Sequence, residues 1–321
     1  MENKLLTIAI PTYNRVENLK RCVQNLQTAI KTYNLSHSIE ILIVDNASTS
    51  YNREDLIYFL EEEITVFIKN ETNIGGELNF FRCIEESKGL YVWVLGDDDY
   101  IYIERLKTVY NLLSDKLSDL IFLNYDLINP ENNEILKRNV VALQPAMSKD
   151  ELIIELNSGL GFISGIIVNK ELFLSNISHE EYKFWLHTSF PYLFSIIKIL
   201  LLPNVRWNLI STSIFQQGGI TYSPNLKWYL SSFIAGLSEI ITYARNNLGL
   251  KFYTYIKLKR RILKDIIAKD FLKRKIDKES LKNYLISVIK NHSLSIDYIL
   301  LFCIIQMVPS NLLIWLKKRF L

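Results

Sequence analysis

The chain has 321 residues, of which 49% are apolar and 22% are charged. This length suits about two domains, and the composition excludes both a single small module and an intrinsically disordered protein. Three cysteines, Cys22, Cys83 and Cys303, stand far apart without a C-x-x-C pair. They exclude a disulfide framework and a cysteine zinc site, so we expect a reducing compartment.

The N-terminal segment carries one lysine and a short apolar run, Leu5 to Ile10, before Pro11. This run is shorter than the apolar core of a secretory signal peptide. We therefore expect a cytoplasmic protein.

The net charge of +3 conceals a strong asymmetry along the chain. Residues 249–321 carry 16 Lys and Arg against 5 Asp and Glu, whereas residues 1–248 carry 21 against 29. A basic segment of this kind favours an anionic partner. Because no zinc-finger, RNP or helix-turn-helix signature accompanies it, we expect an anionic membrane surface and no nucleic acid.

The first hundred residues alternate short β-rich apolar runs with helical patterns, which predicts β-α-β units and a mostly parallel sheet. In chain order the pattern predicts a strand at 5–10, a helix at 15–33, strands at 39–44 and 64–68, a helix at 77–87 and a strand at 90–95. A polar loop follows each strand. Since ligands of such sheets bind outside the carboxyl ends of the strands, we expect these loops to form the functional site.

Beyond residue 100 the alternation is less regular. The pattern predicts a helix near 101–114, a strand at 119–126, a turn at 129–133, a helix near 148–157, a strand at 161–169, a buried helix at 187–202, and a strand and loop at 204–218. From about residue 226 the pattern is helical. We therefore predict an α/β domain over 1–225 and a helical region over 226–321.

Three aspartates, Asp97, Asp98 and Asp99, directly follow the fourth predicted strand. Like charges at such close range raise one another's pKa, so a neutralising partner is expected. Mg²⁺ or Mn²⁺ is suited to this role, because such ions bridge one or two carboxylates to substrate phosphates. The alternative is a solvated turn in which one aspartate caps the next helix.

The loops after the first three strands carry residues suited to a nucleotide. An acidic residue after the second strand can accept hydrogen bonds from a ribose or a base, and paired glycines let the backbone approach a ligand. Each loop alone also fits an ordinary turn. The candidate nucleotide-binding residues are Pro11, Thr12, Tyr13, Asn14, Asp45, Asn73, Gly75, Asn79 and Asp97.

In this order, the runs TIAIPTYNR, ILIVDNAST and NETNIGGELNFFRCIEESKGLYVWVLGDDD resemble the nucleotide-sugar domain of family 2 glycosyltransferases over about residues 5–100. The resemblance implies the GT-A fold, which is a Rossmann-like, mostly parallel sheet flanked by helices. It implies that residues 11–14 line the nucleoside pocket, that Asp45 holds the base or ribose, and that Asn73, Gly75 and Asn79 shape the adjoining wall.

For the aspartate triplet, the resemblance implies a role in metal binding in one of two registers. Either Asp97 and Asp99 are the ends of the family's D-x-D motif, or Asp98 and Asp99 are the equivalent pair. In the second register Gly96 stands in the place of the first aspartate of D-x-D-D.

The resemblance also implies displacement at the anomeric carbon of a nucleoside diphosphate sugar, with the metal stabilising charge on the departing phosphate. In an inverting reaction, a base on the opposite face deprotonates the acceptor hydroxyl. The family commonly supplies this base from a Glu-Asp pair after the strand matched here by GFISGIIVN. This chain instead reads WLHTSFP at 185–191, a helix start similar to that of abequosyltransferase-like enzymes of surface-polysaccharide assembly.

No carboxylate stands at that helix start, so the base has to come from nearby. His187 is the nearest titratable residue, and the unperturbed histidine pKa of about 6.5 suits base catalysis, although a structural histidine is the alternative. Glu180 and Glu181 lie just upstream, in a segment that could close over substrate or form an exposed turn. The candidate catalytic residues are His187, Glu180, Glu181 and Asp98.

Two other functions compete with glycosyl transfer. A sugar-nucleotide nucleotidyltransferase usually begins with a glycine-rich, basic phosphate loop, which residues 11–14 are not. A catalytically silent nucleotide-binding scaffold is compatible with the missing carboxylate base.

The carboxy-terminal region combines charge with apolarity. Ten basic residues lie between Lys251 and Lys275, and the apolar run 296–308 is followed by Pro309. That run is shorter than the roughly 20 residues of a spanning helix, while Trp315 and the basic residues 317–319 suit the headgroup level. We expect peripheral attachment at the cytosolic face of the inner membrane and a glycan or lipid-linked oligosaccharide acceptor; packing into the core is the alternative.

Overall fold

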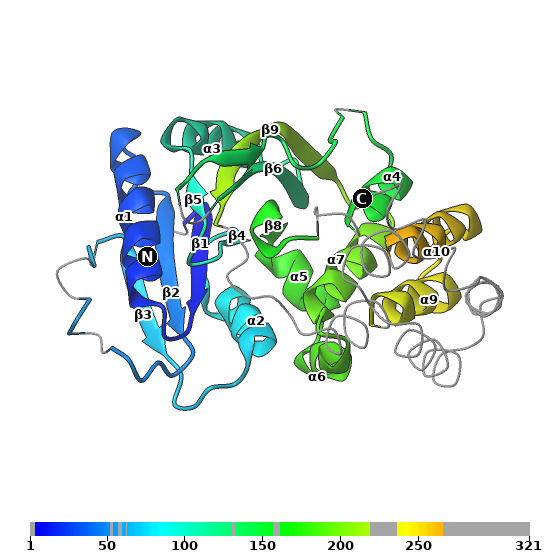
Figure 1. Cartoon of the computed structure of the whole chain (residues 1–321), viewed down its shortest axis with the longest axis horizontal. Coiled ribbons are helices and arrows are strands. Elements are labelled where there is room, and N and C mark those ends of the chain that lie inside the picture. The colour runs from blue at the N-terminus through cyan, green and yellow to red at the C-terminus, as the bar shows by residue number, and fades with distance from the viewer. Residues whose placement is uncertain are drawn as a thin grey trace, which may run out of the picture. The chain divides into compact units, whose positions relative to one another are not determined.

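The structure is a computed structural model, shown in Figure 1. It describes residues 4–51, 54–56, 60–61, 63–129, 132–144, 146–156, 161–218 and 236–265. The chain divides into two compact units. The first comprises residues 1–184 and 191–223, and the second comprises residues 185–190 and 224–321.

The first unit is built around one sheet. Its strands are β1 (Leu6–Thr12), β2 (Ile39–Asp45), β3 (Thr65–Lys69), β4 (Tyr91–Val94), β5 (Tyr100–Ile101), β6 (Leu120–Ile128), β7 (Ile135–Lys137), β8 (Ile166–Asn169) and β9 (Trp207–Gln217). They are ordered β3-β2-β1-β4-β8-β6-β9-β5, and β7 pairs with β6. The first four strands are parallel, and β8 runs antiparallel between β4 and β6.

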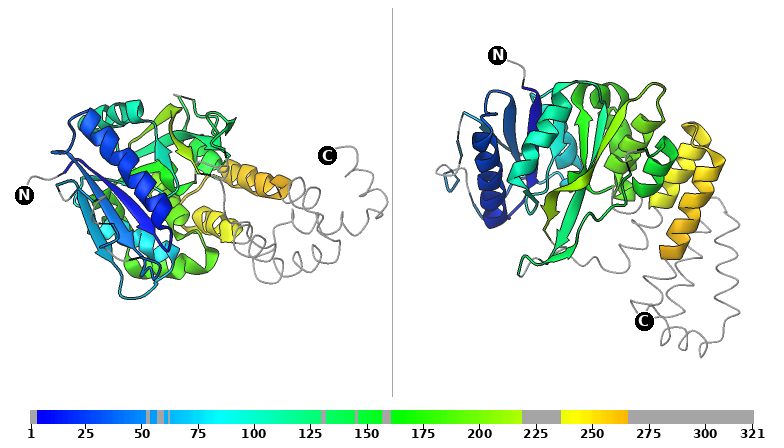
Figure 2. Two further views of the ribbon diagram at one scale, coloured as in Figure 1. Left: turned by 60° about the vertical axis from the view of Figure 1, so that its left-hand side comes forward. Right: turned by 90° about the horizontal axis from the view of Figure 1, so that it is seen from above.

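Seven α-helices and two short 3₁₀ helices are described in this unit. They are α1 (Val16–Thr32), α2 (Gly76–Glu86), η1 (Ile103–Arg105), α3 (Leu106–Ser114), α4 (Lys149–Glu155), η3 (Ile163–Gly165), α5 (Lys170–Asn176), α6 (His179–Phe184) and α7 (Pro191–Leu201). Helix α1 connects β1 to β2, and helix α2 connects β3 to β4. The two connections run in opposite directions along the sheet, because β2 and β3 lie on one side of β1 and β4 lies on the other. Because such crossovers are right-handed, α1 and α2 cover opposite faces of the sheet (Figure 2).

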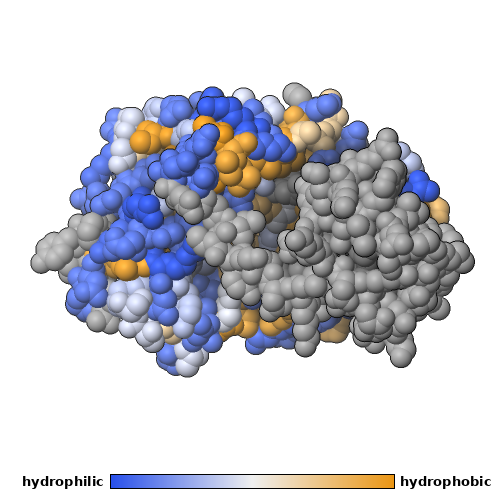
Figure 3. All heavy atoms as spheres, in the orientation of Figure 1, coloured by the Kyte–Doolittle hydropathy of each residue, from blue (hydrophilic) through white to orange (hydrophobic). Residues whose placement is uncertain are grey.

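The spacing of apolar residues along the sequence determines which side chains form the core. Every residue of β2 is buried, which is typical of a parallel strand covered on both faces. Helix α1 buries Leu19, Val23, Leu26 and Ile30, spaced three and four residues apart, and it exposes polar side chains on its other side. Hydrophilic residues accordingly cover most of the first unit on the face shown in Figure 3.

In the second unit the structure describes η4 (Trp185–Thr188), α9 (Leu237–Asn247) and α10 (Phe252–Asp265). Helices α9 and α10 pack against each other, and Gly236 lies so close to Thr188 that a Cβ would be 2.5 Å from the Thr188 carbonyl oxygen. In the part of the chain that is described, no helix is both long and apolar enough to cross a membrane. The predicted apolar run at 296–308 and the basic residues 317–319 lie outside the described residues.

The mostly parallel α/β sheet is confirmed, and the first four strands agree with their predicted positions within about two residues. Three predicted elements need correction. The helix expected near 101–114 has its α-helical part, α3, only from Leu106, because the short strand β5 pairs with β9 at Tyr100–Ile101 and a 3₁₀ turn follows it. The strand expected at 161–169 covers only Ile166–Asn169, because a 3₁₀ turn at Ile163–Gly165 precedes it. The helix expected at 187–202 begins at Pro191, because Ser189 has a left-handed φ of 60° that ends the preceding turn.

The burial of one face of α1 predicts how substitutions on this helix change the free energy of unfolding. Replacing the fully buried Leu26 with alanine leaves a cavity between α1 and the sheet, and should lower the free energy of unfolding by about 2–5 kcal/mol. Gln24→Ala, an exposed change on the same helix, should alter it by less than about 0.5 kcal/mol. Urea unfolding followed by circular dichroism measures both, and equal effects would contradict the proposed core face.

Candidate active site

The sheet brings the predicted loops together at one edge. Strands β1, β2 and β4 run parallel, and their register sets Thr12 at the end of β1 beside Asp45 at the end of β2. The aspartate triplet follows β4 at the same edge, and Thr12 Oγ1 donates a hydrogen bond of 2.8 Å to Asp97. The expectation that these loops meet is therefore confirmed.

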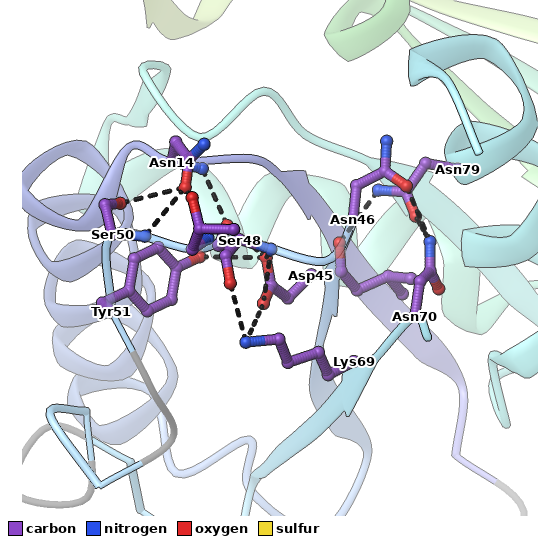
Figure 4. Close-up of polar contacts among 11 residues, drawn as sticks. Asn14, Asp45, Asn46, Ser48, Ser50, Tyr51, Lys69, Asn70 and Asn79 are labelled. Carbon is purple, nitrogen blue, oxygen red and sulfur yellow. Dashed lines mark hydrogen bonds and ion pairs between the residues drawn. The ribbon is translucent and has the colours of Figure 1, made fainter. Parts of the chain in front are cut away.

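Asp45 is fully buried, and donors surround its carboxylate. The Ser48 amide and hydroxyl and the Tyr51 hydroxyl donate to it, and Lys69 Nζ lies 3.7 Å away (Figure 4). Burial raises the pKa of Tyr51 to about 12, so its hydroxyl keeps its proton. The Asp45 carboxylate is thus held in one orientation at the base of the edge.

Asn14 ties the first loop to the second. Its φ of 55° is left-handed, a conformation that asparagine tolerates better than most residues. Its amide donates to Ser48 Oγ, and its side-chain oxygen accepts from the Thr49 and Ser50 amides. The neighbouring Tyr13 is 42% exposed.

A chain of asparagine side chains positions the third loop. The Asn46 side-chain oxygen accepts from Asn70 Nδ2 and from the Ile74 amide, and Asn46 Nδ2 donates 2.9 Å to Asn73. Asn70 Nδ2 also donates to Asn79, whose own amide group donates to the Val44 carbonyl. The predicted residues Asn73 and Asn79 therefore belong to one network that fixes the entry to α2.

Asp97 and Asp98 share one arginine. Arg15 Nη1 lies 2.7 Å from Asp97 Oδ1, and Arg15 Nη2 lies 2.6 Å from Asp98 Oδ2. Burial raises the pKa of Asp97 to about 6, although Arg15 and Thr12 oppose the shift. A neutralising cation was expected beside the triplet, and in this structure the cation in contact with it is a guanidinium.

Asp99 points elsewhere. It accepts a hydrogen bond of 2.6 Å from Ser164 Oγ and one of 3.1 Å from the Gly218 amide. It is fully buried, and this burial raises its pKa well above the usual value. Ser164 Oγ also accepts from the Gly96 amide, so one hydroxyl holds both ends of the aspartate loop.

The side chains available as metal ligands determine whether a divalent ion fits the aspartate loop. Among the described residues, no group of three or more His, Cys, Asp or Glu side chains is arranged to hold a metal. Two carboxylates, Asp97 and Asp98, do face a common point, and a hard cation that keeps several waters needs no more protein ligands than these. This pair differs from both registers that the resemblance implied, since each of those included Asp99.

The candidate bases lie on helices away from this loop in sequence. Glu181 pairs with Lys198 of α7 at 2.7 Å, and Glu180 is exposed at the start of α6, where hydrogen bonds from its own backbone amide and Ser178 lower its pKa. In the second unit, His187 Nε2 lies 3.1 Å from Glu239 of α9.

Sequence reasoning did not assign four residues that organise the site. Arg15 and Ser164 hold the aspartates, and Asn46 and Asn70 hold the third loop. Arg15 could have been assigned from the sequence. It is a basic residue directly after the polar loop 11–14, and a parallel sheet places this loop beside the acidic loop of Asp97 to Asp99.

The chain is similar in sequence to known glycosyltransferases. The sequence model of the family described as glycosyl transferase family 2 matches residues 7–171. Abequosyltransferase RfbV of Salmonella typhimurium is 26% identical over 77% of this chain and 78% of that protein. The uncharacterized glycosyltransferase MJ1057 of Methanocaldococcus jannaschii is 24% identical over 71% and 81%.

Solved structures show the same fold. Staphylococcus aureus TarS 1-349 in complex with UDP matches with a TM-score of 0.61 at 18% identity, covering 88% of this chain and 78% of that one. The mannosyltransferase PcManGT from Pyrobaculum calidifontis, in complex with GDP-Man and Mn²⁺, matches with a TM-score of 0.56 at 11% identity, covering 97% and 82%. The expected GT-A fold is confirmed.

The raised pKa of Asp97 predicts a pH dependence of stability. A carboxyl group that holds its proton more tightly in the folded state stabilises the fold at low pH. This contribution is complete below the unfolded pKa of about 4 and is lost as the pH rises through about 6. Relative to Asp97→Asn, the wild-type chain should therefore lose about 2 kcal/mol of unfolding free energy between about pH 4 and about pH 7. Urea titrations in EDTA test this, and parallel pH profiles for the two proteins would contradict it.

Proposed function

The chain belongs to glycosyl transferase family 2 and is a glycosyltransferase, and we propose that it moves a sugar from a nucleoside diphosphate sugar to a glycan in surface-polysaccharide synthesis. The observation that carries this proposal is the meeting of Asp45 and the aspartate triplet at one sheet edge. The likeness to TarS with UDP and to PcManGT with GDP-Man supports a nucleotide-sugar donor, and the likeness to an abequosyltransferase supports the pathway class.

In the proposed reaction, Asp45 accepts hydrogen bonds from the base or ribose, and the loop of residues 11–14 lines the nucleoside pocket. The Asn46, Asn70 and Asn79 network holds the loop that carries Asn73 and Gly75 against the donor. Asp97 and Asp98 are the residues that would hold Mg²⁺ or Mn²⁺, and the ion would neutralise charge on the diphosphate leaving group. Asp99 keeps the loop in shape through Ser164.

We further propose an inverting reaction in which a side chain of this chain takes the proton of the acceptor hydroxyl. Of the three candidates, we favour His187, because Glu239 can accept a hydrogen bond from its ring N–H and so hold the orientation of the imidazole. Glu181 is engaged by Lys198, and Glu180 carries a lowered pKa, which weakens a carboxylate as a base.

Asp98 gives the direct test of this activity. Asp98→Ala should lower the release of nucleoside diphosphate from the preferred donor by at least about a hundredfold, because stabilisation of the leaving group is lost. The assay is a panel of UDP-, GDP-, CDP- and dTDP-sugars with Mn²⁺. Asp115→Ala, an exposed change just after α3, is the matched control.

A well-folded wild-type protein that turns over none of these donors would favour a nucleotide-binding scaffold. Equal turnover by the wild type and Asp98→Ala would remove Asp98 from the site.

We also propose that the acceptor is lipid-linked and that the chain attaches peripherally to the cytosolic face of the inner membrane. On α10, Tyr253, Lys257 and Arg260 form one exposed stripe at helical spacing, and Phe252 lies beside it. Phe252 and Tyr253 are 61% and 65% exposed, with Arg245 and Lys257 over their respective rings. Exposed aromatics beside basic side chains suit an anionic lipid surface.

The exposed stripe of α10 predicts charge-dependent membrane binding. Each basic side chain near an anionic surface contributes about 1 kcal/mol, so the double variant Lys257→Glu with Arg260→Glu should bind vesicles containing phosphatidylglycerol at least about tenfold more weakly. Co-sedimentation measures the binding. Lys107→Glu with Lys116→Glu, two exposed lysines of the first unit, should change it little. Equal losses in both double variants would indicate a general effect of charge and count against this stripe.

A further inference from the structure

Arg15 bridges two carboxylates, because each of its two terminal nitrogens contacts a different aspartate. Nη1 lies 2.7 Å from Asp97 and Nη2 lies 2.6 Å from Asp98. A guanidinium more often places both nitrogens on one carboxylate in a parallel fork. Here the side chain instead bridges two separate acids at the point where their oxygens converge.

The shape of the aspartate loop does not depend on this bridge. Ser164 Oγ and the Gly218 amide hold Asp99, the Gly96 amide donates to Ser164, and the Asp99 amide donates to the Gly96 carbonyl. Thr12 holds the second oxygen of Asp97. The loop therefore has enough hydrogen bonds to keep its form when the arginine moves.

Arg15 is also accessible to solvent. It stands at the N-cap of α1 rather than inside the helix, and 36% of its side chain is exposed, against 4% for Asp97. Its single charge leaves the two carboxylates with a net charge of about −1 when both are ionised, so a divalent ion at the same point would compensate them more fully. The guanidinium and such an ion cannot share this point, because like charges repel.

We propose that Arg15 is a built-in counter-cation that competes with a divalent metal ion for Asp97 and Asp98. The inference rests on the proposed function, which assigns these two residues to the metal. Arg15 neutralises part of the charge of the two carboxylates while no metal is bound, and it lowers the affinity of the pair for free metal.

Binding of Mn²⁺ alone to the full-length protein, followed by calorimetry or by the electron paramagnetic resonance signal of free Mn²⁺, tests the competition. Arg15→Gln removes the competing charge, so it should bind Mn²⁺ about tenfold more tightly than the wild type, which corresponds to about 1.4 kcal/mol. Arg15→Lys keeps the charge but cannot bridge both acids with two planar nitrogens, so its affinity should lie between the two. Arg21→Gln, an exposed arginine on the same helix, should match the wild type.

A merely structural arginine gives the opposite result, because its loss would disorder the carboxylates and weaken Mn²⁺ binding. Unchanged or weaker binding by folded Arg15→Gln therefore overturns the proposal, and so does an absence of Mn²⁺ binding in every variant. If Arg15→Gln does not fold, the Arg15→Lys result decides. The donor assay with Asp98→Ala tests glycosyl transfer separately. A failure of the proposed function can therefore be distinguished from a failure of the proposed competition between Arg15 and the metal.

Discussion

Burial of acidic side chains at the carboxyl edge of the sheet is the constraint on which the site depends. Asp45, Asp97 and Asp99 are 0%, 3% and 0% exposed, and an ionised carboxylate is costly to bury without partners. Each has its own compensation: a hydroxyl cluster and Lys69 for Asp45, Arg15 and Thr12 for Asp97, and Ser164 and the Gly218 amide for Asp99. These partners fix where the carboxylates point and so define what the edge can bind.

Much of this arrangement could be predicted, because it follows from local rules. The apolar run of β2 and the three- and four-residue spacing in α1 are visible in short windows. Parallel strands then place Thr12 beside Asp45 by geometry alone. For the same reason, residues as far apart as Asn14 and Thr49 could be assigned to one edge before their contacts were known.

The partners of the aspartates could not be predicted, since they come from distant parts of the chain. Ser164 is 65 residues from Asp99, and Gly218 is 119 residues from it. Their contacts depend on β8 and β9 lying at particular places in the sheet, which no local pattern specifies. The turn at Ser189 was missed for a related reason: a serine with left-handed φ is held there by its surroundings, not by its own preference.

Gly96, the residue before the triplet, affects how the aspartates can point. A Cβ on Gly96 would lie 2.8 Å from Asp99 Oδ2, and a Cβ on Gly218 would lie 2.1 Å from the Asp98 carbonyl oxygen. A side chain at position 96 would therefore require the Asp99 carboxylate to shift from its place against Ser164. With Asp99 turned inward to Ser164, Asp97 and Asp98 are the aspartates of the triplet that contact Arg15. The inward turn of Asp99 and the contacts of Asp97 and Asp98 with Arg15 are thus parts of one packing arrangement.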